Sequence, residues 1–185
     1  MGYTFNLILA ILLLVFMIPI MIVIAIFVKF TSHGPIIYWS KRISKNRVFM
    51  MPKFRSLKKD TPVIDSNSLK NPHDYLTPIG GFLRRYSLDE LPQIFSVIKG
   101  DMHLVGPRPA IPSENLLNKL RKDKKLDKVS PGITGWAQIN GRYKLSIYDK
   151  VTLDYEYVKR RSILFDLKIL WLTIFKVVKK EGIRF

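Results

Sequence analysis

The hydrophobic pattern divides the chain at Val28. Residues 7–28 (LILAILLLVFMIPIMIVIAIFV) form an uninterrupted apolar run, and no Lys, Arg, Asp or Glu occurs before Lys29. As a straight helix this run would be about 33 Å long, close to the hydrocarbon thickness of a bilayer. The pattern therefore predicts a membrane anchor over residues 1–30, followed by a single domain over residues 31–185.

Pro19 lies near the middle of this run and should kink the helix. Proline has no N–H for the helix ladder, and its ring crowds the carbonyl of Val15. A kinked helix can span the bilayer, or it can turn back as a re-entrant helix and leave by the face it entered. The sequence leaves both geometries open. A cleaved signal peptide fits less well, because MGYTFN has no basic residue and no small-x-small site follows the run.

Basic residues crowd the C-terminal flank of the anchor. They are Lys29, Lys41, Arg42, Lys45, Arg47, Lys53 and Arg55. The positive-inside rule places such a flank on the cytoplasmic side of the membrane. We therefore expect the domain at the cytoplasmic face.

Beyond the anchor the pattern predicts a mainly helical α+β domain. Two aromatic and β-branched runs in residues 33–57 flank a polar SKRISKN centre and predict a short β-hairpin. Residues 61–75 are rich in Pro, Asn, Ser and Asp, which predicts a loop. Residues 113–129 are typical of a polar helix that Pro131 stops.

Residues 163–180 predict an amphipathic helix with a broad apolar arc. Its polar side holds Asp166, Thr173, Lys176 and Lys180. The arc could be buried in the domain core, or it could lie at the headgroup level of a membrane, where Trp171 and terminal lysines are typical. The sequence leaves both alternatives open.

Composition adds a strong positive charge and excludes several chemistries. The chain has 31 Lys and Arg against 14 Asp and Glu, a formal net charge of +17. This charge predicts polyanionic partners such as nucleic acid, anionic membrane lipid or phosphorylated substrates. Cysteine is absent, and so are the G-x-G-x-x-G, Walker A and G-x-S-x-G motifs. The three histidines lack paired-ligand spacing, which argues against a zinc site.

Residues 84–109 (RRYSLDELPQIFSVIKGDMHLVGPRP) place the adjacent carboxylates Asp89 and Glu90 among arginines. Ser87 and Glu90 fit an S-x-x-E capping box for a helix over LPQIFSVI, although Pro92 would interrupt that helix. The alternative is catalytic. A carboxylate can attack phosphorus, its neighbour can hold Mg²⁺, and arginine forks match phosphate oxygens.

These blocks resemble the small bacterial monotopic phosphoglycosyltransferases, the bacterial sugar transferase family. The resemblance covers nearly the whole chain and rests on the proline-broken anchor, KFRSL, SLDELPQIFSVIKGDMHLVGPRP, PGITGWAQINGR, LDYEYV and LFDLKILWLTI. It implies a membrane-associated single domain on a re-entrant helix, with interfacial amphipathic helices beside it. In one departure, Ile18 precedes Pro19 where relatives commonly have Ser. Asp154, in LDYEYV, is taken as structural.

The resemblance implies that Asp89 attacks the sugar-bearing phosphate of a UDP-sugar, keeps the phosphosugar covalently and releases UMP. Undecaprenyl phosphate would then accept the phosphosugar, which would initiate a surface glycan at the cytoplasmic face of the bacterial inner membrane. Glu90 would hold Mg²⁺. Phosphate or substrate contacts would come from Lys53, Arg55, Arg84, Arg85, Arg108 and Arg142. The expected donor is a UDP-N-acetylhexosamine derivative, with UDP-galactose or UDP-glucose next.

Phosphorylated substrates and anionic membrane lipid as partners explain the positive charge without nucleic acid. The sequence leaves open whether the chain forms a homo-oligomer. Two other function classes account for parts of the pattern. A membrane-tethered binding protein would use Asp89 and Glu90 only as a helix cap, and no RNP-like motif supports a nucleic-acid version of it. A glycosyltransferase that moves sugar without its phosphate would release UDP instead of UMP.

Overall fold

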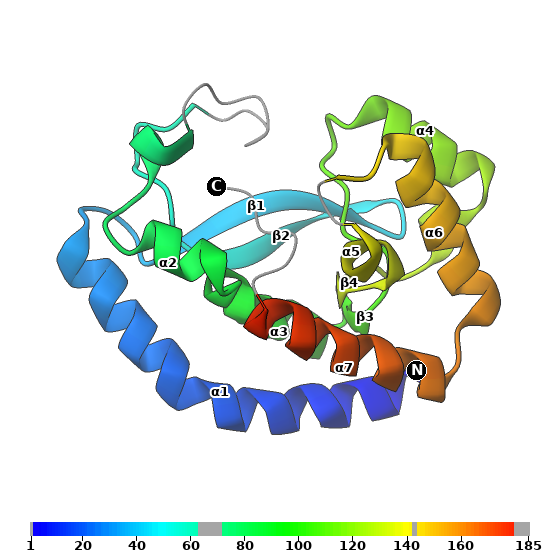
Figure 1. The fold of residues 1–185 in the computed structure, drawn as a ribbon, viewed down its shortest axis with the longest axis horizontal. Coiled ribbons are helices and arrows are strands. Elements are labelled where there is room, and N and C mark those ends of the chain that lie inside the picture. The colour runs from blue at the N-terminus through cyan, green and yellow to red at the C-terminus, as the bar shows by residue number, and fades with distance from the viewer. Residues whose placement is uncertain (1, 63–71, 142–143, 180–185) are drawn as a thin grey trace.

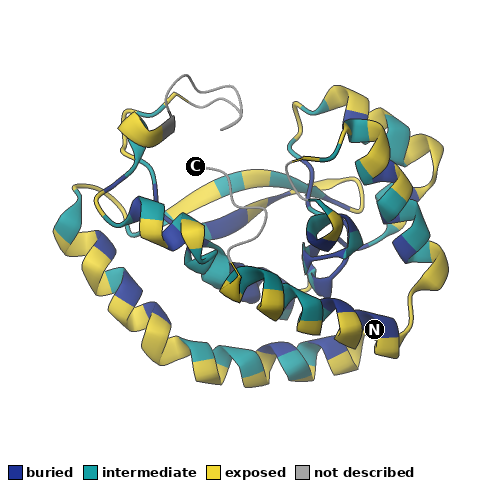
Figure 2. Cartoon of the chain, viewed as in Figure 1, coloured by how far each residue is buried: buried dark blue, intermediate teal, exposed yellow. Residues whose placement is uncertain are grey.

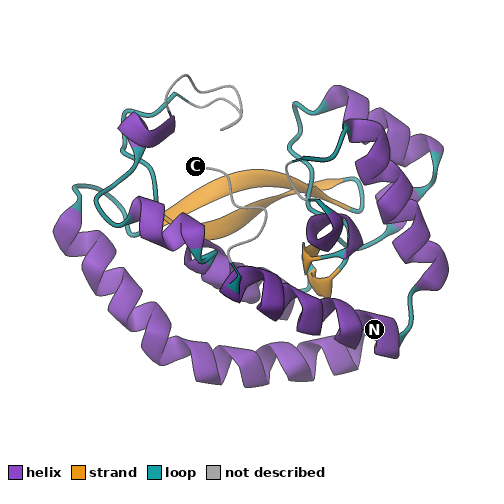
Figure 3. Ribbon diagram, viewed as in Figure 1, coloured by secondary structure: helices purple, strands orange, loops and turns teal. Residues whose placement is uncertain are grey.

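The computed structural model describes residues 2–62, 72–141 and 144–179. It confirms a mainly helical α+β chain with a short antiparallel hairpin (Figures 1 and 3). The elements are α1 Tyr3–Thr31, β1 Ile37–Ser44, β2 Arg47–Phe54, η1 Pro72–Tyr75, α2 Gly80–Arg85, η2 Leu88–Gln93, α3 Ile94–Ile98, β3 His103–Val105, α4 Asn115–Asp123, η3 Leu126–Lys128, β4 Gly132–Thr134, α5 Trp136–Asn140, α6 Ile147–Arg160 and α7 Ile163–Val178.

The hairpin forms where the aromatic and β-branched runs predicted it. β1 and β2 pair antiparallel across a two-residue turn, Lys45 and Asn46, whose φ angles are 46° and 64°. Positive φ at both turn residues is what a two-residue hairpin with right-handed twist requires. This register places Lys53 opposite Tyr38 near the open end of the hairpin. Both side chains line the cavity described below.

The GPRP and PGITG blocks are joined by a short parallel sheet that the sequence did not predict. β3 and β4 pair in parallel, and the loops beyond them continue the contact. The Gly106 amide donates to the Thr134 carbonyl, and the Gly132 amide donates to the Pro107 carbonyl, both at 2.9 Å. A Cβ on Gly132 would lie 2.0 Å from the Gly106 nitrogen, so the close approach requires glycine. The sheet thereby holds the loop that carries Arg108.

Two predicted helices are shorter than expected. Ser87 has a left-handed backbone with φ 54° and makes no capping hydrogen bond through its side chain, so the predicted capping box is wrong. Pro92 donates no N–H to a helix ladder, and the chain forms the 3₁₀ helix η2 before regular helix begins at Ile94. The polar helix expected over residues 113–129 ends at Asp123 and is followed by η3.

The N-terminal helix α1 lies along the domain instead of inside it. Its buried positions recur three or four residues apart near each end: Asn6, Ala10, Met21, Ile24 and Val28. Among the described residues it is the helix long and apolar enough to cross a membrane, and only 11% of its most apolar window is buried. The helix continues through Pro19 and curves along the lower side of Figure 1. A re-entrant path stays a prediction.

Both ends of α1 are hydrogen-bonded to the same domain. Near its start, the side-chain oxygen of Asn6 accepts from the Leu104 amide at 2.8 Å, and Asn6 is fully buried. Just beyond its end, the Arg55 guanidinium donates to the Ser32 carbonyl at 2.8 Å and to the His33 carbonyl. The helix is therefore fixed at both ends.

The C-terminal helix α7 turns part of its polar side toward the protein. Asp166 is fully buried and accepts a 2.8 Å hydrogen bond from the Tyr157 hydroxyl, while the Thr173 hydroxyl lies 2.7 Å from that of Thr134. Much of the apolar arc is exposed, as the colouring of Figure 2 shows. Its exposed members are Ile163, Leu164, Leu167, Trp171, Ile174, Phe175 and Val178. Burial in the core of this domain therefore accounts for Phe165 and Ile169 but not for the exposed members of the arc.

Candidate active site

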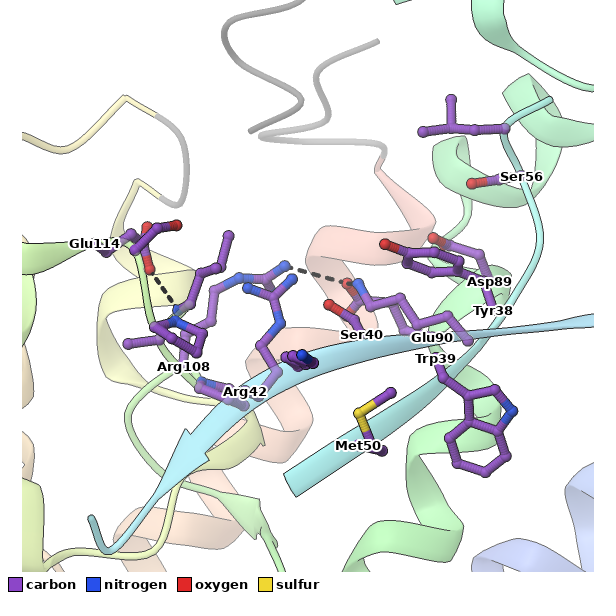
Figure 4. A pocket seen from close by; sticks show the side chains of 18 of the residues that line it. Tyr38, Trp39, Ser40, Arg42, Met50, Ser56, Asp89, Glu90, Arg108 and Glu114 are labelled. Carbon is purple, nitrogen blue, oxygen red and sulfur yellow. Dashed lines mark hydrogen bonds and ion pairs between the residues drawn. The ribbon is translucent and has the colours of Figure 1, made fainter. Parts of the chain in front are cut away.

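A basic cavity of about 820 Å³ lies between the hairpin, η2, the GPRP loop, α4 and α6 (Figure 4). Among its lining residues the basic side chains outnumber the acidic ones. The basic residues are Lys41, Arg42, Lys53, Arg55, Lys58, Lys59, Arg84, Arg108, Arg121 and Lys150, and the acidic residues are Asp89, Glu90, Glu114 and Asp154. Such an excess of positive charge in a concave site concentrates anionic ligands. The cavity is therefore suited to a phosphorylated substrate.

η2 carries the two adjacent carboxylates into this cavity. The left-handed turn at Ser87 starts the 3₁₀ helix, and η2 packs against β2. Asp89 is 8% exposed and lines the cavity together with Glu90. Glu90 Oε1 accepts from Lys53 Nζ at 2.8 Å and from Arg108 Nη2 at 3.4 Å. Lys53 and Arg108 thus fix Glu90 beside Asp89.

Arg42 is a cavity residue that the sequence reasoning did not assign to the site. Burial is the largest cause that lowers the pKa of the Arg42 guanidinium, and the nearby positive charge of Arg108 lowers this pKa further. Its buried Nε has no hydrogen-bond partner among the described residues. Figure 4 shows the two guanidinium groups close together. A bound anion would relieve their repulsion and supply acceptors.

Strand alternation places Arg42 on one face of the hairpin with two other cavity residues. Tyr38, Ser40 and Arg42 are two residues apart on β1 and therefore share this face. All three line the cavity, but Trp39 and Lys41 between them line it as well, so alternation alone does not single out Arg42. A hairpin prediction with a stated register would have placed this face, but the sequence alone did not say which face lies against η2.

In the wall of the cavity, a buried ion pair between Arg121 and Asp154 supports the GPRP loop. Arg121 Nη2 and Nε donate to Asp154 Oδ2 at 2.6 and 3.1 Å, and Nη1 donates to the Arg108 carbonyl at 2.8 Å. The side chains are 11% and 2% exposed. Burial raises the pKa of Asp154, and the positive charge of Arg121 opposes that rise. The structural role expected of Asp154 thus extends to the loop that carries Arg108.

Arg121→Met is expected to lower the free energy of unfolding by about 3–5 kcal/mol, because it leaves the Asp154 carboxylate buried without its cation. Thermal or denaturant unfolding of the purified protein in detergent would measure the change. The matched variant Arg121→Met/Asp154→Asn removes both charges and should recover part of the loss. Equal stability of the single variant and the natural protein would contradict the pairing.

The structure brings only some of the predicted phosphate-binding residues together. Lys53, Arg84 and Arg108 line the cavity with Asp89 and Glu90. Arg55 also lines it, although its guanidinium donates to carbonyls at the end of α1. Arg85 is not among the lining residues, and Arg142 lies outside the described residues. The phosphate contacts of all these residues stay predictions.

The carboxylates of the cavity fit Mg²⁺ bound jointly with a substrate. The described part of the chain has no group of three or more His, Cys, Asp or Glu that could hold a metal ion. Mg²⁺ commonly takes one or two protein carboxylates together with water and substrate phosphates. A carboxylate has about four lone-pair positions. The Glu90 carboxylate can therefore accept hydrogen bonds from Lys53 and Arg108 at Oε1 and still bind a metal ion. The residues present therefore suit this metal.

Comparison with known proteins assigns the chain to a family. Residues 1–180 match the family model described as bacterial sugar transferase. The chain is 40% identical over 182 residues to an undecaprenyl-phosphate glucose phosphotransferase of Komagataeibacter xylinus, covering 92% of this chain and 34% of the relative. It is 40% identical over 181 residues to the UDP-glucose:undecaprenyl-phosphate glucose-1-phosphate transferase of Escherichia coli K12, covering 92% and 39%.

A third relative, from Aeromonas hydrophila, is a UDP-N-acetylgalactosamine-undecaprenyl-phosphate N-acetylgalactosaminephosphotransferase. It is 32% identical over 174 residues, covering 90% of this chain and 41% of the relative. The chain thus spans between a third and about two fifths of the length of these three relatives. The family match itself extends over nearly the whole chain, and the chain belongs to the bacterial sugar transferase family.

Proposed function

We propose that this chain transfers a sugar-1-phosphate from a UDP-sugar to undecaprenyl phosphate, with Asp89 as the nucleophile. The observation that carries the proposal is a largely buried carboxylate, beside a second carboxylate held by two cations, in a cavity whose charged lining residues are mainly Lys and Arg. The names of the Escherichia coli and Aeromonas hydrophila relatives describe this class of reaction.

The proposed reaction has two displacements at one phosphorus. A carboxylate oxygen of Asp89 attacks the sugar-bearing phosphorus, and the bond from that phosphorus to the bridging oxygen breaks. UMP leaves with the bridging oxygen. A phosphate oxygen of undecaprenyl phosphate then attacks the same phosphorus, the Asp89 carboxylate is regenerated, and undecaprenyl-diphospho-sugar forms. A covalent intermediate divides one difficult displacement into two easier ones.

The cations around Asp89 would bind and orient the diphosphate. Arg42 and Arg108 lie together on one side of the cavity, and Lys53 and Arg108 are already paired with Glu90 (Figure 4). Arginine forks match phosphate oxygens in geometry as well as charge. Holding the diphosphate in this way keeps the sugar-bearing phosphorus within reach of Asp89 and supplies rate through orientation.

Glu90 is the proposed ligand of Mg²⁺. When bound, the metal would neutralise negative charge that builds on the phosphoryl oxygens and on departing UMP. Lys53 and Arg108 keep the Glu90 carboxylate in place through their contacts with Oε1. Lys53 and Arg108 would therefore orient the Glu90 carboxylate for binding the metal.

The apolar surface supports a position at one leaflet of the bacterial inner membrane, and the basic flank of α1 supports the cytoplasmic face. α1 and α7 both expose large apolar side chains and lie on the lower side of Figure 1. A helix spanning the bilayer would hold its two ends about 30 Å apart across the hydrocarbon core, with one end beyond the far surface. The hydrogen bonds that the Leu104 amide donates to Asn6 and that Arg55 donates to the Ser32 carbonyl keep both ends of α1 on one domain instead. This favours a re-entrant path, which would hold the cavity near lipid headgroups.

The proposed donor is a UDP-N-acetylhexosamine derivative, and the product would begin a surface glycan. Nucleotide release by the purified protein tests the function directly. The protein is given undecaprenyl phosphate, Mg²⁺ and, separately, UDP-N-acetylglucosamine, UDP-N-acetylgalactosamine, UDP-galactose and UDP-glucose. We expect UMP that depends on both lipid and metal. Release of UDP would assign the chain to glycosyltransferases that move sugar without its phosphate.

A further inference from the structure

A second cavity, of about 610 Å³, lies between the C-terminal half of α1 and the α2–η2 segment. Every residue that lines it is apolar. They include Pro19, Val23 and Phe27 of α1, and Phe82, Leu83 and Leu88 on the facing segment. Phe27 is 55% exposed and Phe82 is 59% exposed, so the cavity is an open groove and not a closed core void.

The groove and the catalytic cavity share the α2–η2 segment as a wall. Leu83 lines the groove while the next residue, Arg84, lines the basic cavity. The same division is repeated at Leu88 and Asp89. Consecutive Cα atoms are about 3.8 Å apart, so the change from apolar to charged lining occurs within one residue step at two places. An apolar site and a phosphate site therefore adjoin along one segment.

We propose that this groove binds the first isoprene units of the polyprenyl chain while the lipid phosphate reaches Asp89. The inference rests on the proposed function, because that function requires a lipid phosphate at Asp89. A polyprenyl phosphate is charged at one end and hydrocarbon along the rest. The charged end matches the basic cavity, and the hydrocarbon chain matches the apolar groove. The groove would thus select and orient the second substrate, and the nucleotide would not use it.

Pro19 then has a role beyond bending the helix. It lines the groove together with Ile20, Val23, Ile24 and Phe27 of α1. The helix ladder is interrupted at proline, so the local path of α1 at this point sets the width of the groove. The anchor and the lipid site are in this view one structural element.

A matched pair of isoleucines tests the proposal. Ile20 lines the groove and is 44% exposed, whereas Ile22 is 55% exposed on the same helix and does not line it. Ile20→Trp should partly fill the groove and raise the KM for undecaprenyl phosphate about tenfold, because several chain carbons lose their contacts. Ile22→Trp should leave that KM within about twofold.

The first half-reaction separates this inference from the proposed function. Exchange of labelled UMP into the UDP-sugar needs no lipid, and both tryptophan variants should retain it. Retained exchange with an unchanged KM in Ile20→Trp would overturn the groove assignment and leave the function intact. Absence of exchange in the natural protein would overturn the proposed function.

A photo-crosslinking measurement does not depend on turnover. p-Benzoylphenylalanine replaces Phe27 in the groove or, as the control, Phe16, which is 74% exposed elsewhere on α1. We expect a crosslink from position 27 to undecaprenyl phosphate that excess unlabelled undecaprenyl phosphate removes and phosphatidylglycerol does not. Equal crosslinking from both positions, or removal by phosphatidylglycerol, would show that bilayer lipid fills the groove and would overturn the proposal.

Discussion

Asp89→Asn should lower UMP release by at least about 10³-fold, since the amide oxygen is a much weaker nucleophile toward phosphorus than the carboxylate. The side chain keeps its size, so the largely buried position should still fold. Both lipid-dependent turnover and lipid-independent UMP exchange should be lost together, because both use the covalent step. Intact-mass spectrometry after mixing with UDP-sugar should show a phosphosugar adduct on the natural protein and none on the variant.

Asp101→Asn provides the matched control for this variant. Asp101 is also an aspartate, pairs with Lys99 at 3.6 Å and is not among the residues that line the catalytic cavity. Its activity should stay within about twofold of the natural protein. An Asp89→Asn protein that retains UMP exchange would assign the chemistry to another group and favour the reading of Asp89 as a structural residue.

Glu90→Gln is expected to have the second largest effect, a fall in turnover of about 10²-fold. The variant loses the negative charge that holds Lys53 and Arg108, and with it the proposed metal ligand. The Mg²⁺ concentration that gives half-maximal rate should rise about tenfold, because an amide oxygen binds Mg²⁺ more weakly than a carboxylate does. Rates measured across a Mg²⁺ titration separate this change from a general loss of activity.

Glu156→Gln is the control for the metal dependence. Glu156 accepts from the Trp136 indole nitrogen at 3.1 Å and does not line the catalytic cavity. Its Mg²⁺ titration should match that of the natural protein. A Glu90→Gln protein with reduced turnover but an unchanged Mg²⁺ titration would limit Glu90 to orienting Lys53 and Arg108.

Local patterns were enough to predict several elements. The charge-free run before Lys29 predicted α1, and the runs around SKRISKN predicted the hairpin, whose turn the structure places at Lys45 and Asn46. These features depend on hydrophobicity and on residues near one another in the chain. The capping box failed for the same reason: a four-residue match could not show that Ser87 adopts a left-handed backbone.

Several residues that line the cavity were named from motifs. They are Asp89, Glu90, Lys53, Arg84 and Arg108, and their roles in catalysis and binding stay predictions. Arg42 and Arg121 were missed, and Asp154 was named only as structural, because the contacts of these residues join segments far apart in the chain. Spacing within one segment carries no information on such contacts.

The sequence by itself determined that an apolar helix precedes a basic, mainly helical domain, and which family motifs that domain contains, because composition and local order suffice for both. Only the tertiary structure decided that α7 turns Asp166 inward and leaves much of its apolar arc exposed. Likewise it decided that both ends of α1 are bound to one domain and that an apolar groove is lined by Leu88, the residue before Asp89. An amphipathic pattern shows that a helix has an apolar side and a polar side. Which of these sides packs against the rest of the protein depends on the neighbouring elements of the fold.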